Sequence, residues 1–411
     1  MRIAEINMVS NGSTGRIMLN IAKCARDNGA EVRTYSTRSA GKKYIRDFPQ
    51  YEGHIYYGSH VENTADLALS RITGGYGVYS RFSTARLIKS LKKFSPDIIH
   101  LHNLHSAFVN LKMLFDYCKK NNISVIWTLH DCWSFTGQCP YFTIVGCDKW
   151  KTGCHDCPQI SIYPKSRTDN TKKWYAKKKE WFCGVENMTL VTPSEWLAGL
   201  TRQSFLKIYP VKVINNGIDL SIFKPVESNF RKKYNCEDKF ILLGVAFGWG
   251  KRKGLDVFVE LSKRLDSNRF QIVLVGTSEA IDTQLPSNII SIHKTDNQSQ
   301  LAEIYTAADL FVNPTREEVL GMVNIESIAC GTPVITFNTG GSPETIDDTC
   351  GCVVDCDDID GMERAILRIE RERPYSETSC MIRAQKYDMN EKFKEYVELY
   401  ENSSRSTECS I

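Results

Sequence analysis

Apolar residues recur along the chain in short blocks whose spacing alternates between that of strands and that of helices. Residues 2–8 form an apolar run, and the apolar side chains within 17–25 share one helical face. Gly29 would end that helix. Runs such as Ile98-Ile99 and Val125-Ile126-Trp127 have no polar alternation, which is typical of strands buried on both faces of a parallel sheet. The strands predicted in this half are 2–8, 97–102, 124–129 and 189–192.

The same alternation begins again in the second half of the chain. It predicts strands over 240–246, 270–275, 288–292, 310–313 and 334–337. Helices are predicted over 255–265, over 300–308 and up to about residue 330. Two separate runs of alternating strands and helices predict two doubly wound α/β sheets with right-handed crossovers.

This organisation predicts two Rossmann-like domains. At 411 residues, the chain is longer than a single hydrophobic core usually supports. We assign residues 1–214 to the first domain, with a cysteine-rich insertion at 132–182, and residues 215–380 to the second. Residues 381–411 are expected to form a helix that packs back on the first domain, followed by a loose tail after residue 402. Ligands of such sheets bind beyond the carboxyl ends of the strands, so two facing sheets would enclose a cleft.

Composition limits the partners and the cellular compartment that can be expected for the protein. The formal net charge of +4 is too small to indicate a nucleic-acid partner. Residues 1–8 lack the basic and then apolar pattern of a signal peptide. The longest apolar stretch, 240–247, is far shorter than the roughly 20 residues that cross a bilayer. A reducing compartment best explains the fifteen cysteines, so we expect a cytoplasmic protein.

The loop after the first predicted strand carries Gly12, Ser13, Thr14 and Gly15. At a helix N-terminus, backbone N–H groups and the helix dipole favour an anion such as a diphosphate, although tight turns of this composition also occur for geometric reasons alone. The order differs from the G-x-G-x-x-G fingerprint, which disfavours NAD. His130 closes a predicted strand at its carboxyl end, so we expect it to face a ligand and not the core.

A basic turn in the second half lies between the end of a strand and the start of a helix. It contains Lys251, Arg252 and Lys253, followed by Gly254. Three cations at that place suit a diphosphate leaving group, whose developing charge needs stabilising. A solvated basic turn is the alternative interpretation.

The most specific string of residues runs from Glu318 to Pro333. Glu318 precedes a predicted helix on which Glu326 lies, and the string ends in a Gly-Thr-Pro stop. Glu326 is expected to accept hydrogen bonds from ribose hydroxyls, and Glu318 to hold sugar hydroxyls. The backbone N–H groups expected to meet phosphate are those of Gly321, Met322 and Val323.

Together these motifs resemble glycosyltransferase family 4, the retaining group with the GT-B fold. The resemblance covers residues 1–400, densely in the second half and more loosely in the first. Within the family, the residues at 12–16 and 130–137 look like those of capsule and exopolysaccharide enzymes, including colanic acid-type transferases. The motifs that carry the family resemblance are Glu318-x7-Glu326, Ala329-Cys330-Gly331-Thr332-Pro333, Asn216-Gly217-Ile218-Asp219, Phe223-Lys224-Pro225, Lys253-Gly254, Ala308-Asp309 and Gly340-Gly341-Ser342-Pro343-Glu344.

The resemblance implies roles for four of these residues. Glu318 would touch the transferred sugar and Glu326 the ribose. Lys253 would stabilise the leaving diphosphate, and His130 would line the donor sugar near the reacting carbon. The implied reaction is a same-face substitution in which the leaving phosphate helps to deprotonate the acceptor. Cationic side chains and helix dipoles would act in place of a catalytic metal ion, and no Asp-x-Asp metal motif is expected at the end of a strand.

One position departs from the family pattern. The family usually has an Arg five residues before the Lys of the Lys-Gly pair, and this chain has Gly248 there. Lys251 or Arg252 would have to serve as the second diphosphate clamp. This departure leaves the roles within the basic turn less firmly assigned than that of Glu326.

Four cysteines are concentrated in one short segment: Cys139, Cys147, Cys154 and Cys157. The final Cys-x2-Cys pair and the intervening glycines suit a tetrahedral thiolate site, which predicts a structural zinc ion. Free thiols or an oxidisable pair are the alternatives. A catalytic metal is not expected here, because four cysteine ligands leave no open coordination position.

Residues 162–182 combine seven basic and two acidic side chains with Trp174, Tyr175, Trp181 and Phe182. Such a mixture can lie at an anionic membrane surface, which would suit a lipid-linked acceptor. The alternative is a solvated helix face. Nothing else in the chain supports a nucleic-acid partner.

We therefore predict a retaining glycosyltransferase of the hexosyltransferase type. It would move a sugar from a UDP- or GDP-sugar to a sugar or lipid-linked sugar acceptor in bacterial surface polysaccharide synthesis. Its expected location is the cytoplasm, with contact to the inner face of the membrane. The two alternatives are a nucleotide-sugar 2-epimerase on a similar fold and a non-catalytic binding subunit, for which Gly248 is the supporting feature.

Overall fold

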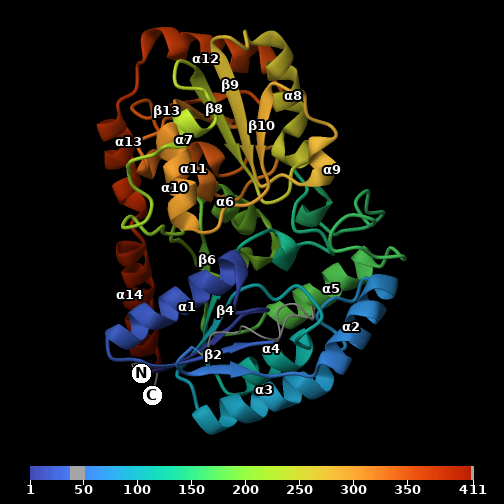
Figure 1. Cartoon of the computed structure of the whole chain (residues 1–411). Coiled ribbons are helices and arrows are strands. Elements are labelled where there is room, and N and C mark those ends of the chain that lie inside the picture. Colours follow the sequence, from blue (N-terminus) through green and yellow to red (C-terminus); the bar gives the residue numbers. More distant parts are fainter. Residues whose placement is uncertain (38–50, 409–411) are drawn as a thin grey trace. The chain divides into compact units, whose positions relative to one another are not determined.

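The computed structural model describes residues 1–37 and 51–408 (Figure 1). Two compact units divide the chain. Met1–Ile214 and the chain from Lys392 onward form the first unit, and Asn215–Glu391 form the second. The chain returns to the first unit at Lys392 and not at residue 381 as predicted, because a helix over Glu377–Ala384 still packs in the second unit's core.

The first unit is built on a seven-stranded sheet of parallel strands in the order β3-β2-β1-β4-β5-β6-β7. β1 ends two residues before the end of the predicted strand, where the chain turns toward the first helix. In the register of the sheet, Glu5 of β1 lies beside His100 of β4. The strands are β1 Arg2–Ile6, β2 Glu31–Ser36, β3 His54–Tyr56, β4 Ile98–Leu101, β5 Ser124–Thr128, β6 Met188–Thr192 and β7 Val211–Val213.

Helices connect these strands in the alternating order that the sequence predicts. The first helix begins at Gly12, earlier than expected from its apolar face, and ends at Asp27 shortly before Gly29. The helices of this unit are α1 Gly12–Asp27, α2 His60–Thr73, α3 Arg81–Phe94, α4 Leu111–Lys120, α5 Thr171–Phe182 and α6 Glu195–Gln203.

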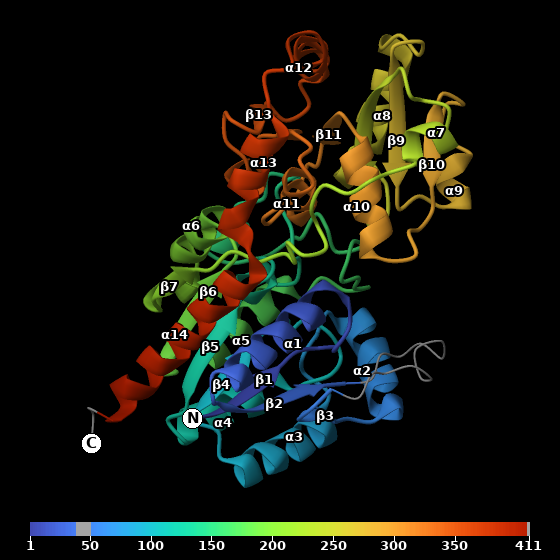
Figure 2. The ribbon, with the colours of Figure 1, turned by 60° about the vertical axis from the view of Figure 1, so that its left-hand side comes forward.

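The last helix, α14 (Met389–Glu408), belongs to the first unit from Lys392 onward. It runs beside the sheet of this unit (Figure 2), where the Thr128 hydroxyl donates to the Tyr396 hydroxyl at 3.2 Å. The Tyr400 hydroxyl lies 2.6 Å from His100 Nδ1. The expected loose tail after residue 402 is wrong as far as residue 408, because these residues continue the helix; residues 409–411 lie outside the described part of the chain.

The second unit contains a six-stranded parallel sheet in the order β10-β9-β8-β11-β12-β13. Its strands are β8 Phe240–Val245, β9 Phe270–Val275, β10 Ile289–Ile292, β11 Leu310–Asn313, β12 Val334–Phe337 and β13 Gly351–Val354. Its helices are α7 Phe230–Lys233, α8 Leu255–Arg264, α9 Glu279–Asp282, α10 Gln298–Ala307, α11 Met322–Ala329, α12 Ile359–Glu372 and α13 Glu377–Ala384.

Alternate residues of the same strands face two separate hydrophobic cores. Leu243 and Phe311 pack in one core with side chains of α10, α11 and α13. Leu242 and Leu310, their neighbours along the same strands, pack in the other core with α8 and α12. Since both faces of the sheet are covered, its strands are mainly apolar on both faces, with Gln271, Ser291, Asn313 and Thr336 as the polar exceptions.

Both sheets reverse their strand order at one point. The reversal falls between β1 and β4 in the first unit and between β8 and β11 in the second. Loops that leave the carboxyl ends of the two strands diverge there, and doubly wound sheets bind ligands at this place. The two doubly wound units confirm the predicted fold class.

We predict that Tyr400→Phe destabilises the first unit by about 1–3 kcal/mol, because it leaves buried polar partners unsatisfied. The lost hydroxyl bonds His100 and lies 3.4 Å from Glu5 Oε1, in a fully buried environment. Urea unfolding followed by circular dichroism measures the change, with Tyr51→Phe at an exposed tyrosine as the matched control. Equal stability of the two variants would contradict the importance of this contact.

Candidate active site

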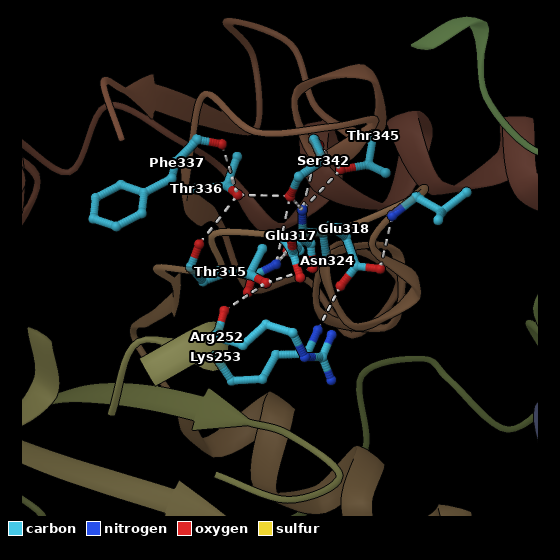
Figure 3. Close-up of polar contacts among 12 residues, drawn as sticks. Arg252, Lys253, Thr315, Glu317, Glu318, Asn324, Thr336, Phe337, Ser342 and Thr345 are labelled. Atoms are coloured by element: carbon cyan, nitrogen blue, oxygen red, sulfur yellow. Dashed lines mark hydrogen bonds and ion pairs between the residues drawn. The ribbon is translucent and has the colours of Figure 1, made fainter. Parts of the chain in front are cut away.

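The strand reversal of the second unit brings together a lysine and a glutamate that are distant in sequence. Lys253 ends the short 3-10 turn η5 (Lys251–Lys253) after β8, and Glu318 lies in the loop after β11. Lys253 Nζ donates to Glu318 Oε2 at 2.6 Å (Figure 3). Their side chains are only 17% and 20% exposed, so this ion pair is more shielded from water than a typical surface pair.

The basic turn is held in place by its own glycine. Gly254 follows the turn with a φ of 73° and closes against Pro314. A Cβ at this position would lie 2.3 Å from the Pro314 carbonyl oxygen. Only glycine therefore allows the turn after β8 to approach the loop after β11 this closely.

Arg316, in the loop after β11, also bonds to the basic turn after β8. Its guanidinium donates two bonds of 2.8 Å to Asp256 and one of 2.6 Å to Asp357. It also donates to the Lys251 carbonyl, and the Arg316 backbone N–H donates to the Arg252 carbonyl at 2.9 Å. Two of these contacts hold the carbonyls of the basic turn and the others engage the guanidinium with two aspartates, so Arg316 positions the turn and is not itself available for a ligand.

Asp355 and Asp357 follow β13 with an Asp-x-Asp spacing, so the expectation that no such motif occurs at the end of a strand is wrong. Asp357 contributes one oxygen to Arg316, as described above, and its φ is 69°. The contact gives this aspartate a structural role in fixing Arg316.

The N-terminus of α11 lies next to the ion pair. Gly321 caps the helix with a φ of 89°, and the Met322 and Val323 amides belong to the first turn, whose N–H groups have no partner within a helix. A buried network of amide and hydroxyl side chains supports this turn: Asn313 donates to Asn324 (2.7 Å), Asn324 donates to Ser342 (2.9 Å) and to Thr345 (3.0 Å), and Ser342 bonds Thr336 (2.7 Å).

The glycine pair after β12 braces the backbone of Glu318. Gly340 has a φ of 60°, and a Cβ there would lie 1.7 Å from the Glu318 carbonyl oxygen. The Gly341 N–H donates to that same oxygen at 3.3 Å. These contacts fix the Glu318 backbone, while its side chain is held by Lys253 and by the Val319 N–H at 3.1 Å.

Glu326 lies on α11 itself and is half-buried. Its Oε2 accepts a hydrogen bond of 3.1 Å from the Tyr305 hydroxyl. Burial first, and then the adjacent Glu326 carboxylate, raise the pKa of Tyr305 well above its usual value, so the phenol keeps its proton and serves as a donor. The glutamate is therefore held in one orientation on the second turn of the helix.

Gly248, at the position of the missing arginine, has a φ of 86°; apart from its two chain neighbours, no atom of the described residues lies within 4 Å of the point that a Cβ would occupy. The neighbouring Phe247 is fully exposed. In the basic turn, Lys251 is exposed to solvent and Arg252 is half-buried. The left-handed backbone conformation favours glycine at position 248 over any other residue.

The other predicted donor-binding residues lie in the first unit, after β1 at the equivalent reversal of its sheet. Gly12, Ser13 and Thr14 form the first turn of α1, directly after β1. Gly15 is closely packed, because a Cβ there would lie 2.5 Å from the Ser10 carbonyl carbon. The first-turn amides of α1 thus lie at the carboxyl edge, as an anion site would need.

His130 follows β5 at the carboxyl edge of the first sheet and is half-buried. Its Nε2 lies 3.3 Å from Nδ1 of His102, whose own Nε2 lies 3.3 Å from Glu5 Oε2. Glu5 also lies near Tyr400, which bonds His100. His130 is thus the outer member of a chain of buried polar groups that the sequence motifs do not predict.

Among the described residues, Glu5, His100 and His102 form one group whose metal-ligand atoms lie within 4.8 Å of one another. Both ring nitrogens of His100 are engaged, by Tyr400 at 2.6 Å and by Thr128 at 2.8 Å. Both ring nitrogens of His102 are engaged by His130 and Glu5. The donors and acceptors of the group satisfy one another, so we interpret it as a hydrogen-bonded network.

Asp131, the residue after His130, is also held by its neighbours. Its Oδ2 pairs with His105 Nε2 at 2.9 Å, and its Oδ1 accepts from the Trp133 N–H at 2.8 Å. Burial alone would raise the pKa of Asp131, but the contacts with His105 and Trp133 outweigh it and the pKa is lowered. Asp131 is therefore an ionised carboxylate that fixes the turn after His130.

The aromatic residues of 162–182 are part of the core. Trp174, Tyr175, Trp181 and Phe182 on α5 are buried, so the prediction that they lie at a membrane surface is wrong for these side chains. They face inward because they repeat at helical spacing, and lysines occupy much of the opposite face. Among the described residues, no helix combines the length and apolar character that a membrane span requires.

Two family models match the chain. The model described as Glycosyltransferase Family 4 matches residues 14–222, and the model described as Glycosyl transferases group 1 matches residues 226–389. A relative from Escherichia coli named as the putative colanic acid biosynthesis glycosyl transferase WcaC is 23% identical, over 98% of this chain and 100% of the relative.

Solved structures with related folds include the sucrose-phosphate synthase of Thermosynechococcus elongatus, with a TM-score of 0.71 at 17% identity and 98% coverage of both chains. Another is Anabaena HepE in complex with UDP-glucose, with a TM-score of 0.66 at 13% identity, covering 98% of this chain and 100% of that one. At these identities the likeness concerns the fold, and it agrees with the predicted GT-B class.

The buried histidines of the first unit predict acid sensitivity. Burial, aided by the neighbouring imidazoles, lowers the pKa of His100 to about 3 and lowers that of His102. Burial lowers the pKa of His130 to about 4. Burial raises the pKa of Glu5, so the folded state holds an extra proton there.

The sign of the pH dependence follows from these four groups. Below about pH 6.5 the unfolded state binds up to three more histidine protons, while the folded state holds one more on Glu5. The free energy of unfolding should thus fall by up to about 3 kcal/mol per pH unit between about pH 6.5 and about pH 4. Urea unfolding across this range measures the slope. His102→Gln should reduce it and His60→Gln, at an exposed site, should not; a flat profile in the wild type would contradict the network.

Proposed function

Because the chain belongs to glycosyltransferase family 4, we propose that it transfers a sugar from a UDP- or GDP-sugar to an acceptor with retention of the anomeric configuration. The observation that carries this proposal is the Lys253–Glu318 ion pair at the strand reversal, beside the N-terminus of α11. A cation, a carboxylate and a set of helix N–H groups at one edge are what a sugar diphosphate requires.

The diphosphate is assigned to Lys253 and the first turn of α11. Breaking the glycosidic bond leaves negative charge on the phosphate, and a fixed ammonium and helix dipole stabilise that charge. Arg252 and Lys251 of the same turn supply the further positive charge that the arginine absent at Gly248 would bring. These groups provide electrostatic stabilisation from the chain itself, so we expect catalysis without added Mg²⁺ or Mn²⁺.

The two glutamates are assigned to the two sugars of the donor. Glu318 lies at the strand reversal, and its paired carboxylate accepts hydrogen bonds, so it suits the hydroxyls of the transferred sugar. Glu326 lies farther along α11, oriented by Tyr305, and suits the vicinal hydroxyls of the ribose. In the chain, the first turn of α11 lies between Glu318, which precedes the helix, and Glu326 on its second turn, so a diphosphate bound at that first turn would have one glutamate on either side in the sequence.

We expect the configuration to be retained because the acceptor attacks from the same face of the sugar that the leaving diphosphate departs from. A double displacement would need a free carboxylate nucleophile. The two carboxylates nearest to His130 in the sequence or in the network are Asp131 and Glu5, and both are already engaged. We therefore assign deprotonation of the acceptor to the leaving phosphate; for His130 only the role that the family resemblance implies is kept.

The acceptor and the pathway are inferred from the relatives. The Escherichia coli relative is named for colanic acid biosynthesis, and the Anabaena structure contains UDP-glucose. We propose a lipid-linked oligosaccharide acceptor in bacterial surface polysaccharide synthesis, approached from the cytoplasmic side. The buried aromatic residues of α5 cannot anchor the protein there, so any contact with the membrane must use other surfaces.

A screen of donor hydrolysis tests the assignment of the glutamates. Among UDP- and GDP-sugars, one donor should be cleaved slowly without acceptor. Glu326→Ala should raise the donor KM about 10–100-fold, because a charged hydrogen bond to bound substrate is lost. Glu318→Ala should lower cleavage about 100-fold. Glu303→Ala, at an exposed glutamate on α10, is the control and should behave as wild type.

The products distinguish the alternatives. A free sugar, or an acceptor glycoside with the anomeric configuration of the donor, supports the proposal. Formation of a second sugar nucleotide without acceptor would indicate an epimerase. Nucleotide binding without any turnover would indicate a non-catalytic subunit and would withdraw the assignments of Glu318 and Glu326.

Lys253→Met tests the role of the ammonium separately. It should lower kcat about 100–1,000-fold with little change in KM, because the charge it stabilises develops in the transition state. Stopped assays that quantify released UDP or GDP give both constants. A rise in KM with unchanged kcat would show that Lys253 only helps to bind the donor.

A further inference from the structure

We propose that Cys139, Cys147, Cys154 and Cys157 bind one Zn²⁺ ion as a structural centre in the first unit. All four side chains line a single cavity of about 300 Å³, including its open mouth, together with Phe142 and Trp150. The segment that carries them has little regular structure beyond the 3-10 turns η2 (Trp133–Phe135) and η3 (Lys149–Lys151). Sulfur ligands in a short irregular loop are the usual setting of a structural zinc ion.

The backbone between the cysteines changes direction at residues with a positive φ, as a short loop must when several of its side chains bind one ion. Asp156 has a φ of 42° inside the Cys154-x2-Cys157 pair, which reverses the chain between the two sulfurs. Gly146, with a φ of 56°, precedes Cys147 directly. Left-handed residues at these places bring consecutive cysteines to the same cavity wall, which a regular helix or strand of this length would not do.

Two backbone amides already point at the sulfur atoms. The Gly137 N–H donates to Cys154 Sγ at 3.1 Å, and the Gln159 N–H donates to Cys157. N–H groups directed at sulfur stabilise a thiolate, as outer contacts of a metal ligand commonly do. Gly137 has no room for a side chain, since a Cβ there would lie 2.9 Å from Cys154 Cβ.

A buried lysine provides the second line of argument. Lys178 of α5 is only 3% exposed and donates to the carbonyls of Trp133 (2.7 Å) and Thr136 (3.1 Å). Burial lowers the pKa of Lys178 well below its usual value, and Cys154, Cys139 and Asp131 act in the opposite direction. Zn²⁺ with four thiolates has a net charge of about −2, so a negative centre of this kind would suit the position of Lys178.

Binding would contract the cavity. Among the described residues, Glu5, His100 and His102 are the only set of three or more residues whose metal-ligand atoms all lie within 4.8 Å of one another. No three of the four cysteine sulfurs are that close, so the sulfurs lie farther apart than a zinc ion would hold them. Zinc would draw each sulfur to about 2.3 Å from the metal ion, and each thiol would give up its proton on binding. All four cysteines are free of disulfides and therefore available.

The centre would support the turn after His130. The Cys132 N–H donates to the Pro140 carbonyl at 3.0 Å, and Thr136 Oγ1 donates to the Cys139 carbonyl at 2.6 Å. The loop that carries the zinc ligands is thus bonded to the same turn that Lys178 holds from the other side. Four cysteine ligands leave no open position, so the ion positions this turn and takes no part in the chemistry.

Metal analysis of the full chain, expressed with zinc in the medium and purified without chelator, tests the proposal. We expect about one zinc per chain by plasma mass spectrometry. The Cys154→Ser/Cys157→Ser double variant should lose it, while Cys356→Ser, which removes an exposed cysteine of the second unit, should keep it. Cobalt exchanged into the wild type should show thiolate-to-metal charge transfer and tetrahedral d–d absorption.

A second measurement covers the case in which the double variant does not fold. In the folded wild type, releasing the metal with a chelator should expose four additional thiols to a thiol reagent. Wild type that contains no stoichiometric metal, or a folded double variant that keeps its zinc, would overturn the proposal. Absorption typical of an iron–sulfur cluster would overturn the assignment to zinc. None of these outcomes depends on the sugar-transfer assignment.

Discussion

The ion pair between Lys253 and Glu318 is the contact on which the geometry of the site depends. The two residues are 65 positions apart, yet their atoms lie 2.6 Å from each other because β8 and β11 are neighbours in the sheet. That adjacency exists only at the point where the strand order reverses. The chain is thus able to place a cation, a carboxylate and a helix N-terminus together without any long loop.

Rigid polar contacts below the surface keep this arrangement in place. Arg316 joins the basic turn to two aspartates, and Asn324 joins the start of α11 to the residues after β12. Both side chains are buried and have several partners each. Pre-positioned charges of this kind need no reorganisation when a leaving group develops charge, which is where enzymes gain most electrostatic stabilisation.

The sequence allowed the buried strands to be predicted well and the edge elements poorly. Strands 270–275, 310–313 and 334–337 match β9, β11 and β12 to the residue, because both of their faces pack in a core. β2 and β3 lie toward the sheet edge with polar side chains and were not predicted. Local motifs predict the glutamates and the lysine of the site, whereas Arg316 and the Glu5 network, whose partners lie far along the chain, carry no local signal.

A crystal structure of the full chain with the donor nucleotide would test the assignment of the site most directly. We expect the diphosphate within hydrogen-bonding distance of Lys253 Nζ and of the amides of Gly321, Met322 and Val323, with the ribose at Glu326. The assignment would be contradicted by a nucleotide that binds elsewhere and contacts neither the Lys253–Glu318 pair nor the first turn of α11.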